Sequence, residues 1–178
     1  DWLSSRGLGD VYKRQDRVNE AVSKLNLSDE DVIINIQGDE PFINPEDINN
    51  LFDLVSKKEI AMGTLYSDLK SLDELEDSNK VKILVNDGIA SNFFRETSLV
   101  NNIFIHQGVY AFKYKTLKSF VSWQPSDNEK KYKLEQFRAL DNGIKINAIK
   151  SVSKIHLGVD TEDDLKKANE IAKDDSYK

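Results

Sequence analysis

The residues best suited to chemistry are two aspartates that follow short apolar runs at distant points of the chain. Asp39 lies in the segment Gln37-Gly38-Asp39-Glu40-Pro41, directly after the apolar run 32–36, and Asp160 follows Gly158 and Val159. In an open α/β sheet, ligands bind beyond the carboxyl ends of the strands, which is where we expect both aspartates. Two carboxylates that converge there could hold Mg2+, which takes one or two protein carboxylates and completes its shell with water and phosphate oxygens.

Each aspartate also has a plainer interpretation. The residues around Asp39 are those of an ordinary acidic turn. Asp160 stands before a helix that Thr161 is suited to cap, and together with Asp163 and Asp164 it would compensate the helix dipole. Spacing alone leaves both interpretations open.

The elements that must position these residues alternate between strands and helices. Apolar periodicity and turn residues predict helices over 16–25, 45–55, 116–123, 126–142 and 161–172. They predict strands over 32–36, 60–66, 80–85, 89–95, 102–112 and 144–149. The turn Asn86-Asp87-Gly88 favours a β-hairpin. The pattern therefore predicts an α/β fold with a mixed sheet, in which crossover connections are interrupted by an antiparallel hairpin.

Composition bounds the class of protein. The chain has 178 residues, a formal net charge of −6, 39% hydrophobic residues and no cysteine. It is long enough for one domain with an ordinary core. The absence of cysteine excludes a disulfide scaffold, a thiolate zinc site and a cysteine nucleophile. No apolar run is long enough for membrane insertion, and the acidic balance argues against a nucleic-acid partner.

Four segments in order make the chain resemble a known family, the 3-deoxy-manno-octulosonate cytidylyltransferases, also called CMP-Kdo synthetases. The resemblance covers about residues 16–175. The segments are Ile34-Asn35-Ile36-Gln37-Gly38-Asp39-Glu40-Pro41, His106-Gln107-Gly108-Val109-Tyr110-Ala111-Phe112, Leu134-Glu135-Gln136-Phe137-Arg138-Ala139-Leu140 and Gly158-Val159-Asp160-Thr161-Glu162-Asp163.

The resemblance implies a fold, a reaction and a setting. The fold is a Rossmann-like three-layer α/β/α nucleotidyltransferase fold. The reaction transfers CMP from CTP to 3-deoxy-manno-octulosonate (Kdo), giving CMP-Kdo and pyrophosphate for lipopolysaccharide biosynthesis. The family is cytoplasmic, depends on Mg2+ and forms a homodimer. These properties are expectations for the present chain.

The resemblance also implies roles for individual residues. Asp39 and Asp160 are the catalytic carboxylates that bind Mg2+, and the substrate-binding residues are Gln37, Arg95, His106, Tyr110, Glu135 and Gln136. Arginine suits the acid because its planar fork can pair with both carboxylate oxygens. His106 and Tyr110 are four apart on a predicted strand and so share a face. Glu135 and Gln136 are neighbours on a helix and do not.

Without the resemblance, these residues have simpler interpretations. Arg95 would be a surface arginine on a hairpin, since charged residues are mostly exposed. His106 and Tyr110 would be polar tips of a half-buried strand, and Glu135 and Gln136 part of a solvated helical face.

The chain departs from the family pattern at its beginning. It contains no glycine- and arginine-bearing signature that would hold the CTP phosphates. We therefore interpret residues 1–15 as a non-native or disordered head and residues 16–178 as the C-terminal part of one cytidylyltransferase domain that lacks its first strand–helix units. On this interpretation the chain is inactive by itself, and a non-catalytic fragment is one alternative function.

Two smaller departures lie close to the expected sugar site. The segment Phe93-Phe94-Arg95-Glu96 keeps the family's arginine but lacks its serine and the following proline, and Tyr132 stands where the family often has glutamate. These changes leave open a second alternative, a cytidylyltransferase for another 2-keto sugar acid such as amino-Kdo.

Overall fold

The structure, a computed structural model, describes residues 14–153, 155–159 and 161–173. Residues 1–13 of the predicted head lie outside this part of the chain, and Arg14 and Gln15 begin the first helix. The strands are β1 (Val32–Asn35), β2 (Met62–Ser67), β3 (Lys82–Asn86), β4 (Ile89–Phe94), β5 (Ile103–Lys113) and β6 (Ile146–Lys150). The helices are α1 (Arg14–Val22), α2 (Pro45–Ser56), the 3-10 helix η3 (Leu72–Leu75), α3 (Tyr114–Ser122), α4 (Asp127–Tyr132), α5 (Gln136–Asp141) and α6 (Glu162–Lys173).

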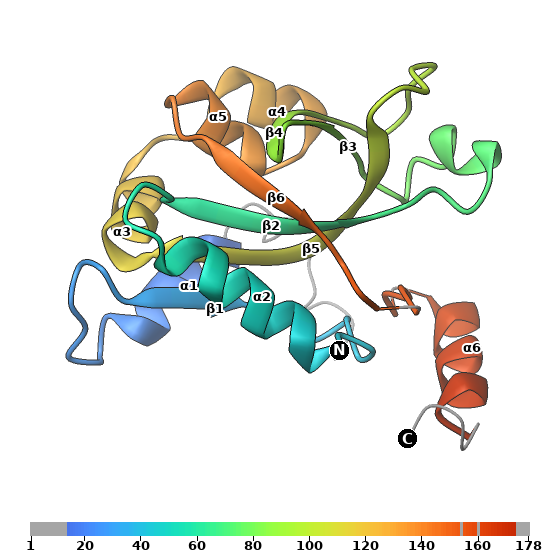
Figure 1. Ribbon diagram of the computed structural model, residues 1–178, viewed down its shortest axis with the longest axis horizontal. Helices are drawn as coiled ribbons and strands as arrows, with labels where there is room; N and C mark the ends of the chain where they lie inside the picture. The colour runs from blue at the N-terminus through green and yellow to red at the C-terminus, as the bar shows by residue number, and fades with distance from the viewer. Residues whose placement is uncertain (1–13, 154, 160, 174–178) are drawn as a thin grey trace, which may run out of the picture.

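One mixed sheet of six strands, in the order β1-β5-β2-β6-β4-β3, forms the centre of the molecule (Figure 1). β2 and β6 pair in parallel, whereas β5 runs antiparallel to both β1 and β2. β3 also pairs with the first residues of β5, so that the sheet curls back on itself. β5 thus connects the β1 end of the sheet with the β3–β4 hairpin.

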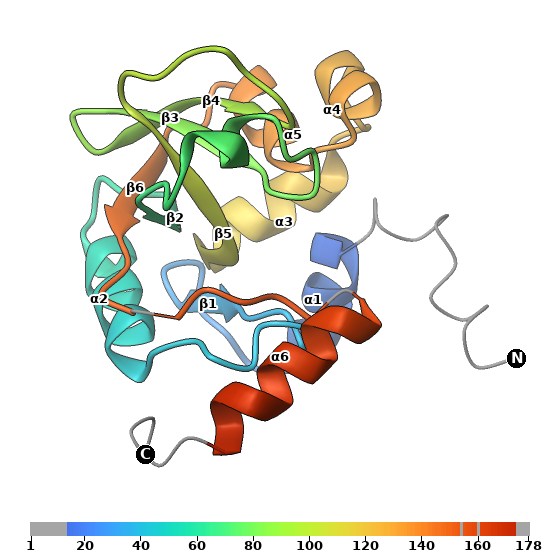
Figure 2. The ribbon, with the colours of Figure 1, turned by 90° about the vertical axis from the view of Figure 1, so that its right-hand side faces the viewer.

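Helices cover both faces of the sheet, as a three-layer arrangement requires. On one face α2 packs Leu51 and Val55 against Leu65, Val109 and Ala111 of the strands. The other face carries the larger core, which joins side chains of β2–β6 with those of α3 and α5. Figure 2 shows α6 at the lower end of the molecule, away from α4 and α5. This layering confirms the predicted α/β fold.

Local signals explain several of these elements. Asn44 caps α2 by accepting the Glu46 backbone N–H (2.9 Å), and Pro45 follows at the first helical position. Asp87 and Gly88 both have positive φ, 49° and 74°, as the two-residue turn of a hairpin requires. None of the helices in the described part of the chain combines the length and apolar character that a membrane crossing requires.

The prediction of one continuous helix over 126–142 is wrong. α4 ends at Tyr132 because Lys133 adopts a left-handed conformation (φ 55°), and α5 begins only at Gln136. The buried carboxylate of Glu129 joins the two short helices by accepting hydrogen bonds from Arg138 Nε (2.8 Å) and Nη2 (2.5 Å). This corner forms a wall of the cavity described below.

Candidate active site

Asp39 lies in the loop that follows β1, beside the segment that leads to α6. Its backbone carbonyl accepts a hydrogen bond from Val159 N–H (2.8 Å). Its Oδ1 atom is buried and, within the described residues, has no hydrogen-bond partner. A buried acceptor without a partner is unfavourable, so this oxygen is suited to a ligand. Asp160, the residue after Val159, lies outside the described residues, so its predicted role stays a prediction.

Gln37 connects this loop to β5. Its Nε2 atom donates to the Gly108 carbonyl (2.8 Å) at a point where β5 carries two extra residues between its pairings with Thr64 and Leu65. A Cβ at Gly108 would stand 2.8 Å from the same Gln37 nitrogen, so the glycine makes room for this contact. The loop after β1 is thereby fixed against the strand that carries His106 and Tyr110.

Arg95 follows β4 and lines a cavity of about 390 Å³. The arginine is exposed, and its guanidinium donates to the carbonyls of Ser78 and Lys133, both at 3.2 Å. A guanidinium has five N–H donors, and these two bonds leave donors that have no other partner in the described chain. The cavity is lined by Asn92, Phe93, Phe94, Arg95, Glu96, Asn128, Tyr132 and Phe137. It therefore combines aromatic rings, two amides, the Arg95 cation and the Glu96 carboxylate.

His106 and Tyr110 share a face of β5, as predicted. Their ring centres lie 5.3 Å apart. The irregularity between them adds two residues to β5, an even number, so the side chains before and after it still alternate between the two faces of the sheet. His106 also meets Phe93 of the cavity edge to face, with ring centres 5.2 Å apart. Tyr110 is buried in the larger core. His106 thus lies directly behind Phe93 of the cavity wall, and Tyr110 packs against His106.

The environment of His106 keeps its ring neutral. Burial lowers its pKa to about 3. The Thr64 hydroxyl donates to the Val109 carbonyl (2.8 Å), so its contact with His106 Nε2 (2.9 Å) is one in which the imidazole donates. The other ring nitrogen, Nδ1, is then an acceptor.

Glu135 and Gln136 stand at the start of α5. Glu135 is half-buried and Gln136 is buried. Neither lines the cavity, although Phe137, which follows them, does. The structure therefore brings both residues near the cavity without giving either a place on its surface.

Sequence reasoning missed several residues around the site. Phe93, Phe137 and Asn128 line the cavity, and Thr64 orients His106. Phe93 and Phe137 stand in the segments quoted above, but none of the four residues was predicted to take part in the site. Lys82 is buried completely beneath the Arg95 segment. Its signal in the sequence is weak, a single lysine within the apolar run 81–85.

Comparison with protein families and with individual proteins gives consistent results. A family model described as cytidylyltransferase matches residues 9–146. The 3-deoxy-manno-octulosonate cytidylyltransferase 2 of Actinobacillus pleuropneumoniae serotype 5b is 36% identical over 172 residues, with 88% of this chain and 68% of that protein aligned. The 3-deoxy-manno-octulosonate cytidylyltransferase of Francisella tularensis subsp. holarctica is 33% identical over 170 residues, with the same coverage.

Solved structures show the same likeness. A CMP:2-keto-3-deoxy-manno-octonic acid synthetase complexed with CTP superposes with a TM-score of 0.78 at 28% identity, covering 89% of this chain and 67% of that one. An inositol-1-phosphate CTP transferase from T. maritima gives a TM-score of 0.59 at 19% identity, covering 85% of this chain and 58% of that one. The second likeness concerns the fold alone.

Proposed function

The chain belongs to the cytidylyltransferase family, and from this premise we propose that it acts in the transfer of CMP from CTP to Kdo. The single observation that supports Kdo as the acceptor is the cavity that Arg95 lines. Its volume lies in the range of small-molecule sites. An exposed guanidinium with donors to spare matches a sugar carboxylate, and the amides of Asn92 and Asn128 match sugar hydroxyls.

The proposed reaction is a displacement at phosphorus. The anomeric hydroxyl of Kdo attacks the α-phosphorus of CTP, the bond to the β,γ-pyrophosphate breaks, and the hydroxyl proton is lost to solvent or base. The attacking oxygen belongs to the substrate, so no protein nucleophile is needed. The protein's task is to hold two anionic substrates in line and to offset their charge.

The residues present fit Mg2+, which the family implies. Within the described residues no three side chains of histidine, cysteine, aspartate or glutamate form a metal cluster. Mg2+ needs only one or two protein carboxylates, and the buried Oδ1 of Asp39, which has no hydrogen-bond partner in the described chain, would suit that role. We propose Asp39 and Asp160 as the ligands. Bound there, the metal would neutralise charge on the phosphates.

The wider setting is part of the same proposal. We place the reaction in the cytoplasm, as a step of lipopolysaccharide biosynthesis, and in a homodimer. Gln37, His106, Tyr110, Glu135 and Gln136 are proposed to bind substrate alongside Arg95. What supports these assignments is the resemblance, together with the contacts of Gln37 and His106 described above.

Acid binding tests the proposal without depending on contacts to the CTP phosphates. Calorimetric titration of residues 1–178 with Kdo should show binding, and Arg95→Gln should weaken it roughly tenfold to a hundredfold because a charge-assisted contact is lost. Lys118→Met, which removes an exposed cation on α3, should leave the affinity unchanged. Equal affinity of wild type and Arg95→Gln would overturn the assignment of the acid site.

Turnover gives a second readout. Pyrophosphate release from CTP by residues 1–178, dependent on Kdo, would confirm the function directly and would contradict the expectation that this chain is inactive by itself.

The alternative acceptor, another 2-keto sugar acid such as amino-Kdo, stays open because Tyr132, which stands where the family often has glutamate, lies at the cavity. Tyr132 lines the cavity and stacks against Phe137, with ring centres 5.1 Å apart. Titration with both acids decides between them, because the true acceptor should bind more tightly. Tyr132→Glu should change their ratio if this ring selects the acceptor.

A further inference from the structure

Lys82 is a charged side chain buried at the junction of three strands. It opens β3, where it pairs with Phe94 of β4 and Ile105 of β5. Its exposed fraction is 0%. Burying an ammonium group is costly unless hydrogen bonds compensate it, so a lysine in this position calls for a reason.

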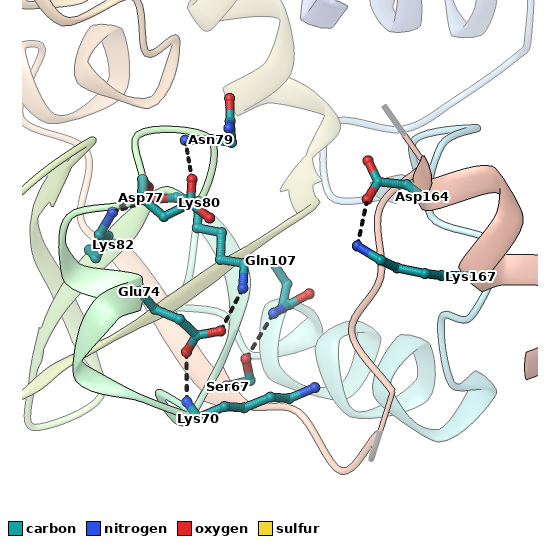
Figure 3. A network of polar contacts seen from close by, with 10 residues as sticks. All are labelled: Ser67, Lys70, Glu74, Asp77, Asn79, Lys80, Lys82, Gln107, Asp164 and Lys167. Atoms are coloured by element: carbon teal, nitrogen blue, oxygen red, sulfur yellow. Dashed lines mark hydrogen bonds and ion pairs between the residues drawn. The ribbon is translucent and has the colours of Figure 1, made fainter. Parts of the chain in front are cut away.

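The ammonium group is held by backbone carbonyls. Nζ donates to the carbonyl oxygens of Asp77 (2.6 Å), Lys80 (2.8 Å) and Arg95 (2.5 Å). An ammonium has three N–H donors, so these bonds use its full capacity. Two of the acceptors come from the loop 77–80 and the third from the end of β4 (Figure 3 shows Lys82 beside Asp77).

The loop that Lys82 holds is itself well defined. The Asn79 backbone N–H donates to the Asp77 carboxylate (3.0 Å). Glu74 accepts from the Lys70 backbone N–H and from Lys80 Nζ, both at 2.6 Å (Figure 3). The loop therefore offers Lys82 a fixed pair of carbonyls.

The same loop also receives the Arg95 side chain. The guanidinium donates to Ser78 of the loop and to Lys133 at the end of α4. Lys82 thus fixes two parts of the structure together, the backbone of Arg95 and the loop 77–80 that orients the Arg95 guanidinium. Displacement of either would move the cation that lines the cavity.

We propose that Lys82 is a positioning residue of the acid site, which acts by holding Arg95 in the orientation that binds a carboxylate. This inference rests on the proposed function, since it takes Arg95 as the acid-binding residue. Lys82 is fully buried and is not expected to touch substrate; it acts through Arg95.

A double-mutant cycle on residues 1–178 tests the inference, with Kdo as the probe in calorimetric titration. Lys82→Met should weaken binding roughly tenfold, and by no more than Arg95→Gln does. In the Arg95→Gln background, Lys82→Met should add no further loss, because the two residues act as one unit. Lys82→Gln, which keeps two N–H donors, should lose less than Lys82→Met.

Lys113→Met is the matched control. Lys113 is also a buried lysine, but it pairs with Glu30 (2.6 Å) at the far end of β5. The Lys113→Met variant should lower the thermal midpoint, as Lys82→Met does, but leave the affinity for Kdo unchanged. If Lys82 had only a structural role, Lys82→Met would give this same result. Unchanged Kdo affinity in folded Lys82→Met, or a loss of affinity that adds to the loss in Arg95→Gln, would therefore overturn the inference.

The wild-type chain supplies a readout that needs no variant to fold. Saturation with Kdo should shift the NMR signal of the Lys82 ammonium and leave that of Lys113 in place, and an unmoved Lys82 signal would overturn the inference. Binding of Kdo that depends on Arg95 but not on Lys82 would leave the proposed function intact. A wild-type chain that binds no 2-keto sugar acid would overturn both.

Discussion

His106 ties the stability of the chain to pH. Burial lowers its pKa to about 3, whereas an unfolded chain holds it near 6.5. The unfolded state therefore takes up the proton first as the pH falls. The stability that His106 contributes is complete above pH 6.5 and is lost progressively as the pH falls toward 3.

Urea unfolding of wild type and His106→Asn checks this linkage. Between pH 7 and pH 5, we expect the unfolding free energy of wild type to fall by about 2 kcal/mol more than that of His106→Asn. Each pKa unit corresponds to about 1.4 kcal/mol. The other titrating groups are common to both chains and cancel. A difference that stays constant over this range would place the pKa of His106 near its ordinary value.

Gln37 and Gly108 should act as one unit. In Gly108→Ala the new Cβ would stand 2.8 Å from Gln37 Nε2, and the flexible amide must leave the Gly108 carbonyl. We expect the variant to fold and to bind Kdo with roughly fivefold lower affinity, the value of one hydrogen bond. Gln37→Ala should lose the same amount, and the double variant no more. Gly108→Ala with wild-type affinity would separate Gln37 from the site.

At the scale of elements, the corner between α4 and α5 depends on one buried ion pair. Arg138 and Glu129 are 3% and 0% exposed, and the Arg138 guanidinium also lies 4.8 Å from the centre of the Phe120 ring. Arg138→Met would leave Glu129 buried without its cation. We expect a loss of about 3–5 kcal/mol in unfolding free energy, measured in urea.

Two variants complete that experiment. Lys130→Met removes an exposed cation of α4, 3.8 Å from Asp127, and should cost at most about 0.5 kcal/mol. The double variant Glu129→Gln, Arg138→Met should recover part of the loss because the stranded charge is gone. A loss in Arg138→Met no larger than that in Lys130→Met would contradict the role of the pair.

Elements with local signals could be predicted from the sequence. Asn44-Pro45 starts α2 and Asp87-Gly88 turns the hairpin, and both signals depend only on neighbouring residues. The break at Lys133 could not be predicted, because a lysine with positive φ carries no such signal. The pairing of β3 with β5 was also hidden, since it joins strands that are distant along the chain.

The residues of the candidate site also differ in how far the sequence could predict them. Asp39, Arg95 and the pair His106 and Tyr110 stand in motifs that could be compared with a family. Lys82 has only a weak signal, one lysine in an apolar run, and its role could not be predicted because the three carbonyls that hold it come together only in the folded loop.

At the scale of the whole molecule, β5 joins the two halves of the site. Its residues 106–110 contact Gln37 of the loop after β1 on one side and Phe93 of the cavity on the other. The hydrogen bond from Val159 to Asp39 then attaches the C-terminal segment, and with it α6, to the same loop. A ligand of Asp39 should therefore stabilise contacts between distant parts of the chain.

Magnesium titration tests that coupling. Without metal, the buried Oδ1 of Asp39 lacks a partner in the described chain, so Asp39→Asn should be as stable as wild type or more so.

At ten times its dissociation constant, a ligand stabilises the folded state by about 1.4 kcal/mol, which raises the thermal midpoint of a chain of this size by roughly 3–6 °C. We expect this rise with MgCl2 but not with NaCl of equal ionic strength. Asp53→Asn, an exposed change on α2, should keep the rise, and Asp39→Asn should lose it. If MgCl2 raised the thermal midpoint of Asp39→Asn as much as that of wild type, the metal would have to bind elsewhere, because this variant lacks the Asp39 carboxylate.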